Sequence, residues 1–405
     1  MEFEFEVTVH EEGASAKNLF FHTMINSHIA ILDSTLNPYW LVNVGEIGLD
    51  FKVNQNSITY FQKDSLFWIV MDQNMNEIDT LRCVNGLFPD YHDVQLVEGG
   101  GYILQSYYDS YIDMTQYIPN GNPNALVKSE LVIQEFDSED NLIFEWYAHN
   151  HLNIGDYSNL NISSPEFTWM HGNSIEIDFD NNLILSNRRS SEAIKIDRIT
   201  GEVIWILGGP LSDFTFLNDP FNGFSKQHDI RRLENGNLLI FDNGTEHEPQ
   251  ISRIVEYELN LEAMTAELVW EYSHPEEYVG VSMGSVQRLD NGNSLINWGN
   301  IQGLGAILTE INMEKEILLE IIFPVGFKIY KARKFDWSFN IDMTIGDINL
   351  DSYINIVDIL LMVNIILQPE DNIPLLQLYK ADLNIDGEIN VSDVVEIINI
   401  ILNSE

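Results

Sequence analysis

Three histidines stand near the start of similar sequence units, and they are the first candidates for chemistry. His92, His171 and His228 lie in "YHDVQLVEGGGYILQS" (91–106), "HGNSIEIDFDNNLILSN" (171–187) and "QHDIRRLENGNLLIFDNG" (227–244). A fourth unit, "GSVQRLDNGNSLINWG" (284–299), has Gly284 at the matching place, so the turn does not itself require histidine. Near neutral pH, histidine serves as a nucleophile, an acid–base group or a metal ligand.

Neighbouring polar residues decide between a cation and an anion at such a site. Three histidines could hold Zn²⁺. Asn173, however, follows His171 by two residues, and "LSNRRSSEAIKI" adds Arg188 or Arg189. A guanidinium disfavours a cation, and its planar fork of donors suits sulfate, phosphate or carboxylate. We therefore predict an anionic substrate, a histidine nucleophile or acid–base group, and arginine and asparagine donors to the non-bridging oxygens.

The elements that carry these residues read as β-hairpins, with apolar alternation on either side of a Gly or Asn turn. A second kind of hairpin recurs at 29–40, 68–81, 131–146, 193–205, 254–270 and 307–321. Repeats at intervals of roughly 40–60 residues indicate propellers or solenoids. Two hairpins make one four-stranded blade, so the predicted fold class is all-β, a six-bladed β-propeller.

The propeller hypothesis places the histidines together. The first strand of each blade is innermost, so its leading residues line one mouth of the central channel. Asp93 and Asp229 follow two of the histidines, but neighbours in a strand point to opposite faces, so we expect these carboxylates to pair within the blade wall. Residues 105–130 and 147–170 are expected to be loops over one face.

Two acidic segments after residue 343 indicate a different chemistry. Each places Asp or Asn at positions 1, 3, 5, 9 and 12 of a twelve-residue loop, ahead of an amphipathic helix. The predicted ligands are Asp347, Asn349, Asp351, Asn355 and Asp358, then Asp382, Asn384, Asp386, Asn390 and Asp393. Hard oxygen ligands at this spacing wrap one Ca²⁺ each, so we predict two structural calcium ions. A helix-capping turn would explain one such loop, but two in register favour calcium.

Residues 346–402 closely resemble the type I dockerin, a duplicated calcium loop–helix module. Position 12 is Asp rather than the Glu of an ordinary EF-hand, and a single helix follows each loop. The resemblance implies an extracellular module that folds with calcium and docks to a cohesin-like partner. Gly387 stands at position 6 of the second loop, whereas Ser352 replaces the usual glycine of the first, so the first site should be weaker.

The propeller units are similar to those of the bacterial arylsulfotransferases, the aryl-sulfate sulfotransferases of the six-bladed propeller type. The resemblance covers residues 90–337 and rests on "HGNS", "SNRRSS", "QHDI" and "GSVQRLDNGNSLINWG". It implies transfer of a sulfuryl group from a phenolic sulfate to a phenol, independent of the nucleotide donor PAPS and of any catalytic cofactor. The transfer would pass through a transiently sulfated histidine.

The same resemblance assigns roles to five residues of this chain. The histidine of "QHDI", His228, would be the nucleophile. His171 and Asn173 of "HGNS" would bind the sulfuryl oxygens and help proton transfer. Arg188 of "SNRRSS" would stabilise the developing oxyanion, and His92 of "YHDV" would be a further sulfuryl-binding or acid–base group.

These features predict an extracellular sulfotransferase, tethered by a dockerin, that acts on an aryl sulfate donor and a phenolic or other hydroxyl acceptor. Because many proteins with dockerins act on polysaccharides, the donor or acceptor could also be a glycan. The alternative is a non-catalytic ligand- or glycan-binding propeller of a dockerin-anchored polysaccharide-processing assembly. Glycoside hydrolysis or lyase action rests on the dockerin alone; hydrolysis would need paired carboxylates at the channel mouth. The expected divisions are an N-terminal edge segment (1–17), a propeller (18–340) and a calcium-binding domain (344–405).

The composition argues against several other classes. With 20 Lys and Arg against 63 Asp and Glu, the formal net charge of −43 repels nucleic-acid phosphates. The single Cys83 cannot form an intramolecular disulfide. No apolar run has the length of a membrane span. The opening "MEFEFEVTVHEEG" does not read as a signal peptide, yet we expect a secreted or cell-surface protein.

Overall fold

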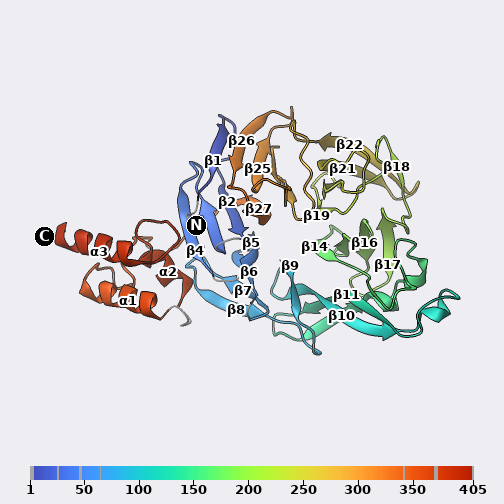
Figure 1. Ribbon diagram of the computed structural model, residues 1–405, viewed down its shortest axis with the longest axis horizontal. Coiled ribbons are helices and arrows are strands. Elements are labelled where there is room, and N and C mark those ends of the chain that lie inside the picture. The colour runs from blue at the N-terminus through green and yellow to red at the C-terminus, as the bar shows by residue number, and fades with distance from the viewer. Residues whose placement is uncertain are drawn as a thin grey trace.

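The computed structural model describes residues 4–24, 27–44, 48–63, 65–340, 343–368 and 373–403. Six β-sheets of four main strands surround a common axis, and three helices lie outside this ring, beside β4 (Pro38–Asn43) (Figure 1). The predicted fold class, a six-bladed β-propeller followed by a small helical domain, is therefore confirmed.

Within each blade, the order runs from the innermost to the outermost strand. Blades one and two consist of β27 (Ile329–Phe335), β2 (Asn18–Thr23), β3 (His28–Leu32) and β4, then β5 (Gly48–Asn54), β6 (Ser57–Gln62), β7 (Phe67–Met71) and β8 (Glu77–Leu81). Blades three and four consist of β9 (Pro89–Leu96), β10 (Tyr102–Ile112), β11 (Ala125–Phe136) and β12 (Leu142–Tyr147), then β14 (Gly172–Ile177), β15 (Leu183–Asn187), β16 (Glu192–Ile196) and β17 (Val203–Leu207). Blades five and six consist of β19 (His228–Arg232), β20 (Leu238–Asp242), β21 (Arg253–Asn260) and β22 (Thr265–Tyr272), then β23 (Ser285–Arg288), β24 (Ser294–Asn297), β25 (Ile307–Ile311) and β26 (Ile317–Ile322).

Three short strands extend the blades at their edges. β1 (Glu6–His10) is antiparallel to β26, while β13 (Glu166–Thr168) and β18 (Thr215–Leu217) run parallel to β11 and β22. Short 3₁₀ helices lie in the loops of blade three, at η1 (Met114–Gln116), η2 (Ala148–Asn150) and η3 (Ile154–Asp156). Covering an edge strand in this way removes unpaired backbone groups from solvent.

The two ends of the propeller sequence meet in blade one. β27 pairs antiparallel with β2, from Asn18 opposite Phe335 to Thr23 opposite Ile329. Each innermost strand contacts the innermost strands of both neighbouring blades, which completes the ring. Fully buried tryptophans, among them Trp40, Trp68 and Trp146, pack in the core of the blades. The ring is thus closed by sheet pairing and filled by aromatic packing.

One loop expectation is wrong. Residues 105–112 and 125–130 belong to β10 and β11, which pair as far as Ile112 opposite Ala125, so only residues 113–124 connect them. The pairing continues past an irregularity between Tyr108 and Ser110. Tyrosine favours strands, but the polar residues around these tyrosines hide that tendency in the sequence pattern. Residues 147–170 are largely irregular, as expected, apart from η2, η3 and β13.

The C-terminal domain contains α1 (Ile356–Leu367), α2 (Leu375–Ala381) and α3 (Val391–Asn403). α1 and α3 are the helices predicted after each loop, whereas α2 was not predicted. α2 packs against β4: the ring of Tyr379 stacks on Trp40 at 4.6 Å with an interplanar angle of 15°. A seven-residue helix is not stable alone, so α2 depends on this packing. The local sequence therefore could not predict it.

Candidate active site

A cavity of about 360 Å³ lies at the mouth of the channel where the innermost strands begin. Its lining includes His92, His171, His228 and Arg188, four of the five residues predicted for the site. The other lining residues, most of them apolar or aromatic, are Met24, Leu49, Phe61, Lys63, Tyr91, Ser282, Met283 and Tyr330. This volume and mixture of side chains suit a small organic ligand with one polar end.

The register between blades shows which residues are equivalent. In four of the innermost strands, a side-chain oxygen accepts a hydrogen bond from a backbone N–H of the next blade. The N–H of Ile175 donates to Asp93, that of Ile230 to Ser174, that of Val286 to Asp229 and that of Ala332 to Ser285, at 3.0, 3.1, 3.0 and 3.1 Å. The counterpart of His92 and His228 is therefore Asn173, and His171 stands two residues earlier. Since side chains alternate along an extended chain, His171 lies on the same face of the chain as Asn173, two residues nearer the mouth of the channel.

His228 is 2% exposed and is bonded at both ring nitrogens. Its Nδ1 lies 2.6 Å from Oδ1 of Asn243, and its Nε2 accepts a 3.2 Å bond from the backbone N–H of Met283. Burial lowers the pKa of His228 well below its usual value, and the charge of Arg188 lowers it further, although the bond to Asn243 opposes the shift. The ring is therefore neutral near pH 7, as a nucleophile requires.

His92 forms a dyad with Asp90, a residue that the sequence analysis did not select. Oδ1 of Asp90 lies 2.5 Å from Nδ1 of His92 and also accepts from its backbone N–H and from Nε2 of Gln105. Burial opposes ionisation of Asp90, but His92 and Gln105 hold the pKa of this carboxyl below its usual value. A carboxylate that orients a histidine is the usual arrangement of an acid–base group.

His171 meets His92 edge to face, with ring centroids 4.6 Å apart. Burial lowers the pKa of His171 to about 3, and His92 and Arg188 contribute. Its backbone N–H donates to Oδ1 of Asn187 at 3.0 Å. His171 is therefore a neutral, positioned ring at physiological pH, able to hydrogen-bond an anion without carrying charge itself.

Arg188 brings positive charge into the cavity. Its Nη2 donates to the carbonyl of Val281 at 2.9 Å, while its Nε is buried and has no hydrogen-bond partner among the described residues. Burial lowers the pKa of Arg188, as does neighbouring Arg189, yet a guanidinium remains charged in proteins. Because an unpaired buried donor is costly, an anion in the cavity would complete the environment of Arg188.

Asn173, Asp93 and Asp229 do not line the cavity. Nδ2 of Asn173 donates to the carbonyl of Gln227 at 2.7 Å. The two aspartates are paired, as expected, but most of their partners lie on the innermost strands of other blades and not within one blade wall. Asp93 pairs with Lys52 and Arg231, and Asp229 pairs with Arg231 and Arg333. These ion pairs join the innermost strands of blades two, three, five and one.

Asn243 and Tyr330 were not predicted from the sequence. Asn243 lies in "FDNG" at the end of β20, where asparagine before glycine reads as a turn residue. Tyr330 takes the place of His92 and His228 in blade one, because Ala332 takes the place of Val286 in the bonds between blades. Its hydroxyl donates to the carbonyl of Asn173 at 3.2 Å. No local signal in "FKIYKARKF" marks this equivalence.

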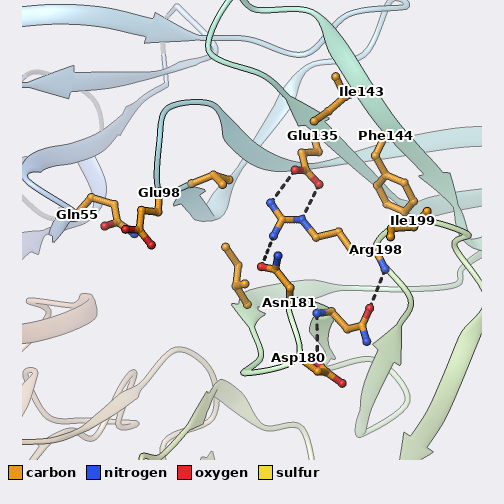
Figure 2. Close-up of a pocket in the computed structure, with 12 residues that line it drawn as sticks. Gln55, Glu98, Glu135, Ile143, Phe144, Asp180, Asn181, Arg198 and Ile199 are labelled. Carbon is orange, nitrogen blue, oxygen red and sulfur yellow. Dashed lines mark hydrogen bonds and ion pairs between the residues drawn. The ribbon is translucent and has the colours of Figure 1, made fainter.

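A larger pocket of about 720 Å³ lies at the other ends of the innermost strands, beside the first turns of blades two, three and four. Figure 2 shows Arg198 in this pocket, bonded through two nitrogens to Glu135 and through Nη1 to Asn181. Its backbone N–H donates to Asn182. Since these polar groups bond one another and no histidine is among the described lining residues, we place the candidate active site in the smaller cavity.

The two predicted calcium loops have the same hydrogen-bond pattern. Asp358 accepts the backbone N–H groups of residues 348, 349 and 355, and Asp393 accepts those of 383, 384 and 390. Burial raises the pKa of Asp382 to about 7, with further contributions from Asp393 and Asp386. A divalent cation would stabilise these neighbouring carboxylates, so the residue types fit Ca²⁺, although no group of three or more His, Cys, Asp or Glu side chains in the described ranges is arranged to hold a metal ion.

The first loop differs in two respects. Ser352 adopts φ 68°, close to the 84° of Gly387 at the same position, so both loops need the left-handed conformation that glycine favours. Lys380 lies 3.9 Å from a carboxylate oxygen of Asp347. Asn355 also caps α1, so the capping and calcium interpretations apply to the same residue.

Comparison with known proteins gives the family. The arylsulfotransferase (ASST) family model matches residues 9–331, and the dockerin type I domain model matches residues 345–402. The chain therefore belongs to the arylsulfotransferase family and carries a type I dockerin domain. No curated protein matches the sequence.

Several solved structures are similar in part. A protein of unknown function from Bacteroides caccae has 14% identity and a TM-score of 0.49, over 78% of this chain and 98% of that chain. A streptogramin B lyase has 10% identity and 0.43, over 82% and 98%. A catalytically inactive virginiamycin B lyase from Staphylococcus aureus, with quinupristin, has 9% identity and 0.40, over 80% and 89%. All three TM-scores are below 0.5.

None of the helices in the described ranges combines the length and apolar character needed to cross a membrane.

Proposed function

We propose that this chain moves a sulfuryl group from an aryl sulfate to a phenolic or other hydroxyl acceptor, with His228 as the nucleophile. The observation that carries the proposal is the shared cavity: a buried, neutral His228 lies with an arginine whose Nε has no partner among the described residues. A pure binding site for an aromatic ligand would not need an oriented imidazole beside a half-buried arginine.

In the first step the lone pair of His228 Nε2 attacks the sulfur of the donor. The N–S bond forms as the bond from sulfur to the aryl oxygen breaks, and the electron pair leaves on the phenolate. Nδ1 keeps its proton, so the ring carries positive charge while the sulfuryl oxygens carry negative charge. Arg188 and His171 donate to these oxygens. His92 starts this step with protons on both ring nitrogens, keeps the one on Nδ1 against Asp90 and gives the one on Nε2 to the phenolate.

The second step reverses the first with a new acceptor. His92 takes the proton of the acceptor hydroxyl, whose oxygen attacks the sulfur. The N–S bond breaks and its electron pair returns to Nε2 of His228. Dividing the transfer into two displacements at one histidine is covalent catalysis, and it predicts ping-pong kinetics.

The cavity favours a small aromatic donor over a sulfated glycan. Phe61, Tyr91 and Tyr330 offer apolar surface to a phenyl ring, and the volume of about 360 Å³ suits one small molecule. The net charge of −43 also repels a polyanion such as a sulfated polysaccharide. A small aryl sulfate carries one negative charge, which Arg188 offsets.

The dockerin domain would tether the enzyme outside the cell to a cohesin-like protein, with two calcium ions holding its loops. Its two longer helices expose a large apolar surface, which comprises Ile356, Val357, Leu360 and Leu367 on α1, and Val391, Val395, Ile398 and Leu402 on α3. An apolar surface of this kind on a small domain fits a protein partner.

The test is release of p-nitrophenol from p-nitrophenyl sulfate, with and without added phenol. We expect release by the wild type that depends on phenol, and a loss of about a thousandfold or more in His228→Ala. His10→Ala, at an exposed position on β1, is the matched control and should keep wild-type activity. No release by a folded wild-type protein that still binds the aryl sulfate would contradict the proposal and favour the non-catalytic binding propeller.

A further inference from the structure

We propose that Asn243 is a positioning residue that holds His228 in the tautomer with its proton on Nδ1 and its lone pair on Nε2. The proposal concerns the same cavity and rests on the proposed sulfuryl transfer for its kinetic consequence. Asn243 lies in the same sequence unit as His228 (227–244), but it was given no role there, and it does not line the cavity itself.

The orientation of the Asn243 amide follows from its partners. Nδ2 donates to the carbonyl of Gly280 at 2.7 Å and to the carbonyl of Met283 at 2.9 Å. Carbonyl oxygens only accept hydrogen bonds, so the NH₂ group must face them and cannot be exchanged with the oxygen. The amide oxygen is therefore the atom that faces Nδ1 of His228, at 2.6 Å.

The tautomer of His228 follows in turn from two independent bonds. An amide oxygen only accepts, so Nδ1 of His228 must carry the proton that it donates to Asn243. At the other side of the ring, Nε2 lies 3.2 Å from the backbone nitrogen of Met283, which only donates. Nε2 must therefore hold the lone pair. Both bonds select the same neutral tautomer, and it is the one that makes Nε2 nucleophilic.

The segment 280–283 links Asn243 to the anion-binding side of the cavity. Asn243 holds the carbonyls at both ends of this segment, while the carbonyl of Val281 between them accepts Nη2 of Arg188. The long bond from Met283 to Nε2 must break when sulfur takes the lone pair, which frees that N–H to donate to a sulfuryl oxygen. One amide thus positions the nucleophile and a segment that binds Arg188.

The neutrality of Asn243 matters for the reaction. A carboxylate at the same place would also accept from Nδ1, but it would stabilise the imidazolium form of His228, which has no lone pair. The charged and titratable groups that face His228 are Arg188, His171, His92 and Tyr330. None of the four is a carboxylate, so Asn243→Asp would introduce the first negative charge in direct contact with the ring.

The kinetic test compares the acid side of the pH profile of kcat/KM in the wild type and Asn243→Asp. We expect Asn243→Asp to move this limb upward by about one to three pH units, the usual effect of a carboxylate beside a histidine. A merely structural defect would lower the rate at every pH without moving the limb. An unmoved limb in Asn243→Asp would overturn the proposal.

Asn297 provides the matched control, because its Nδ2 also donates to two carbonyls of a neighbouring strand, those of Ile329 and Tyr330 at 2.9 and 3.1 Å. Its Oδ1 accepts from the backbone of Gly299 instead of a histidine. Asn297→Asp also places a carboxylate against two carbonyl groups, but this carboxylate does not contact a histidine. The acid limb of its pH profile should therefore coincide with that of the wild type, even if its rate is lower.

A second measurement does not depend on turnover. In ¹⁵N-histidine-labelled protein, the two-bond ¹H–¹⁵N pattern distinguishes the two neutral tautomers, and comparison with His228→Gln assigns the signals of His228. We expect the pattern with the proton on Nδ1. Detection of the Nε2–H tautomer in the wild type would overturn the proposal, even if sulfuryl transfer is active. The expected tautomer in a protein without transferase activity would support the positioning and contradict only the proposed function.

Discussion

At the scale of residues, the cavity brings together polar side chains, and the burial of each one alone costs free energy. Burial removes the charge of His228 and His171, while Arg188 keeps its charge next to them. An anion would stabilise the positive charge of Arg188 beside the neutral imidazoles, because the buried Nε of this half-buried arginine otherwise has no partner in the described structure. We therefore propose that these residues bind an anion.

Arg188→Lys should show how far the contribution of Arg188 to kcat depends on the geometry of its guanidinium and not on its charge alone. Lysine keeps the positive charge but lacks the planar fork and the Nε donor, so we expect kcat with p-nitrophenyl sulfate to fall by about a hundredfold. Arg189→Lys is the control, because Arg189 is exposed and does not line the cavity. Equal kcat values in the two variants would show that the Nε donor of Arg188 makes no contribution.

At the scale of elements, the innermost strands position the site and the calcium loops position the dockerin helices. The bonds between blades determine which side chain of each innermost strand reaches the mouth. In the C-terminal domain, the second loop also contacts the propeller, since Nε2 of His28 lies 3.0 Å from the carbonyl of Gly387. The two loops share a sequence pattern but have different surroundings.

Ser352→Gly should strengthen the first calcium site. Ser352 has φ 68°, a conformation that costs a residue with a side chain about 1 kcal/mol. Relief of this strain predicts about a fivefold tighter first site in a calorimetric calcium titration of the full chain. Gly387→Ser is the reverse substitution and should weaken the second site, where an added Cβ would lie 2.2 Å from Nε2 of His28. An unchanged calcium affinity of the first site in Ser352→Gly would mean that the backbone strain at Ser352 does not affect calcium binding.

Tyr379→Ala should uncouple the dockerin domain from the propeller. The Tyr379 ring is buried on Trp40, and removal of a buried aromatic side chain costs about 3 kcal/mol. In the wild type we expect calcium to raise the thermal transition of the propeller, because the calcium-bound domain packs on blade one. This rise should disappear in calorimetry of Tyr379→Ala and persist in Tyr353→Ala, whose ring is 72% exposed. A rise retained in Tyr379→Ala would show that the two domains unfold independently.

At the scale of the whole molecule, the stability of the propeller depends on titratable side chains that are buried in their neutral form. His22 on β2 is 1% exposed, and burial followed by the proximity of His28 lowers the pKa of His22 to about 3. In the unfolded chain the same imidazole takes up a proton below about pH 6.5. The unfolded state therefore gains stability relative to the folded state as the pH falls between these two values.

His22→Gln should make the propeller less sensitive to acid. In the wild type, the free energy of unfolding should fall by about 2 kcal/mol from this group alone between pH 6.5 and pH 4.5, and the loss should continue towards pH 3. Denaturant titrations at both pH values should show a smaller decrease for His22→Gln than for the wild type. His10→Gln, at an exposed site, should follow the wild type. Parallel pH dependence in His22→Gln would rule out this origin of acid sensitivity.

The sequence alone determined the hairpins, the number of blades and the oxygen-ligand pattern of the calcium loops. All three depend on local features: alternation of apolar residues, Gly or Asn at turns, and fixed spacing within twelve residues. It also identified His92, His171 and His228, because they lie in repeated units whose sequences can be aligned with one another, while the resemblance to the arylsulfotransferases selected Arg188 over Arg189. Four residues that share a cavity in the structure were thus predicted from the sequence.

Only the tertiary structure decided how the units are aligned in space. Asn173, rather than His171, is the counterpart of the other two histidines, and Tyr330 takes the same place in the last strand. Asn243 reaches His228 across a β-ladder. These relations depend on hydrogen bonds between strands and blades that are far apart in the sequence. A shift of two residues preserves every apolar alternation, so the sequence pattern could not reveal it.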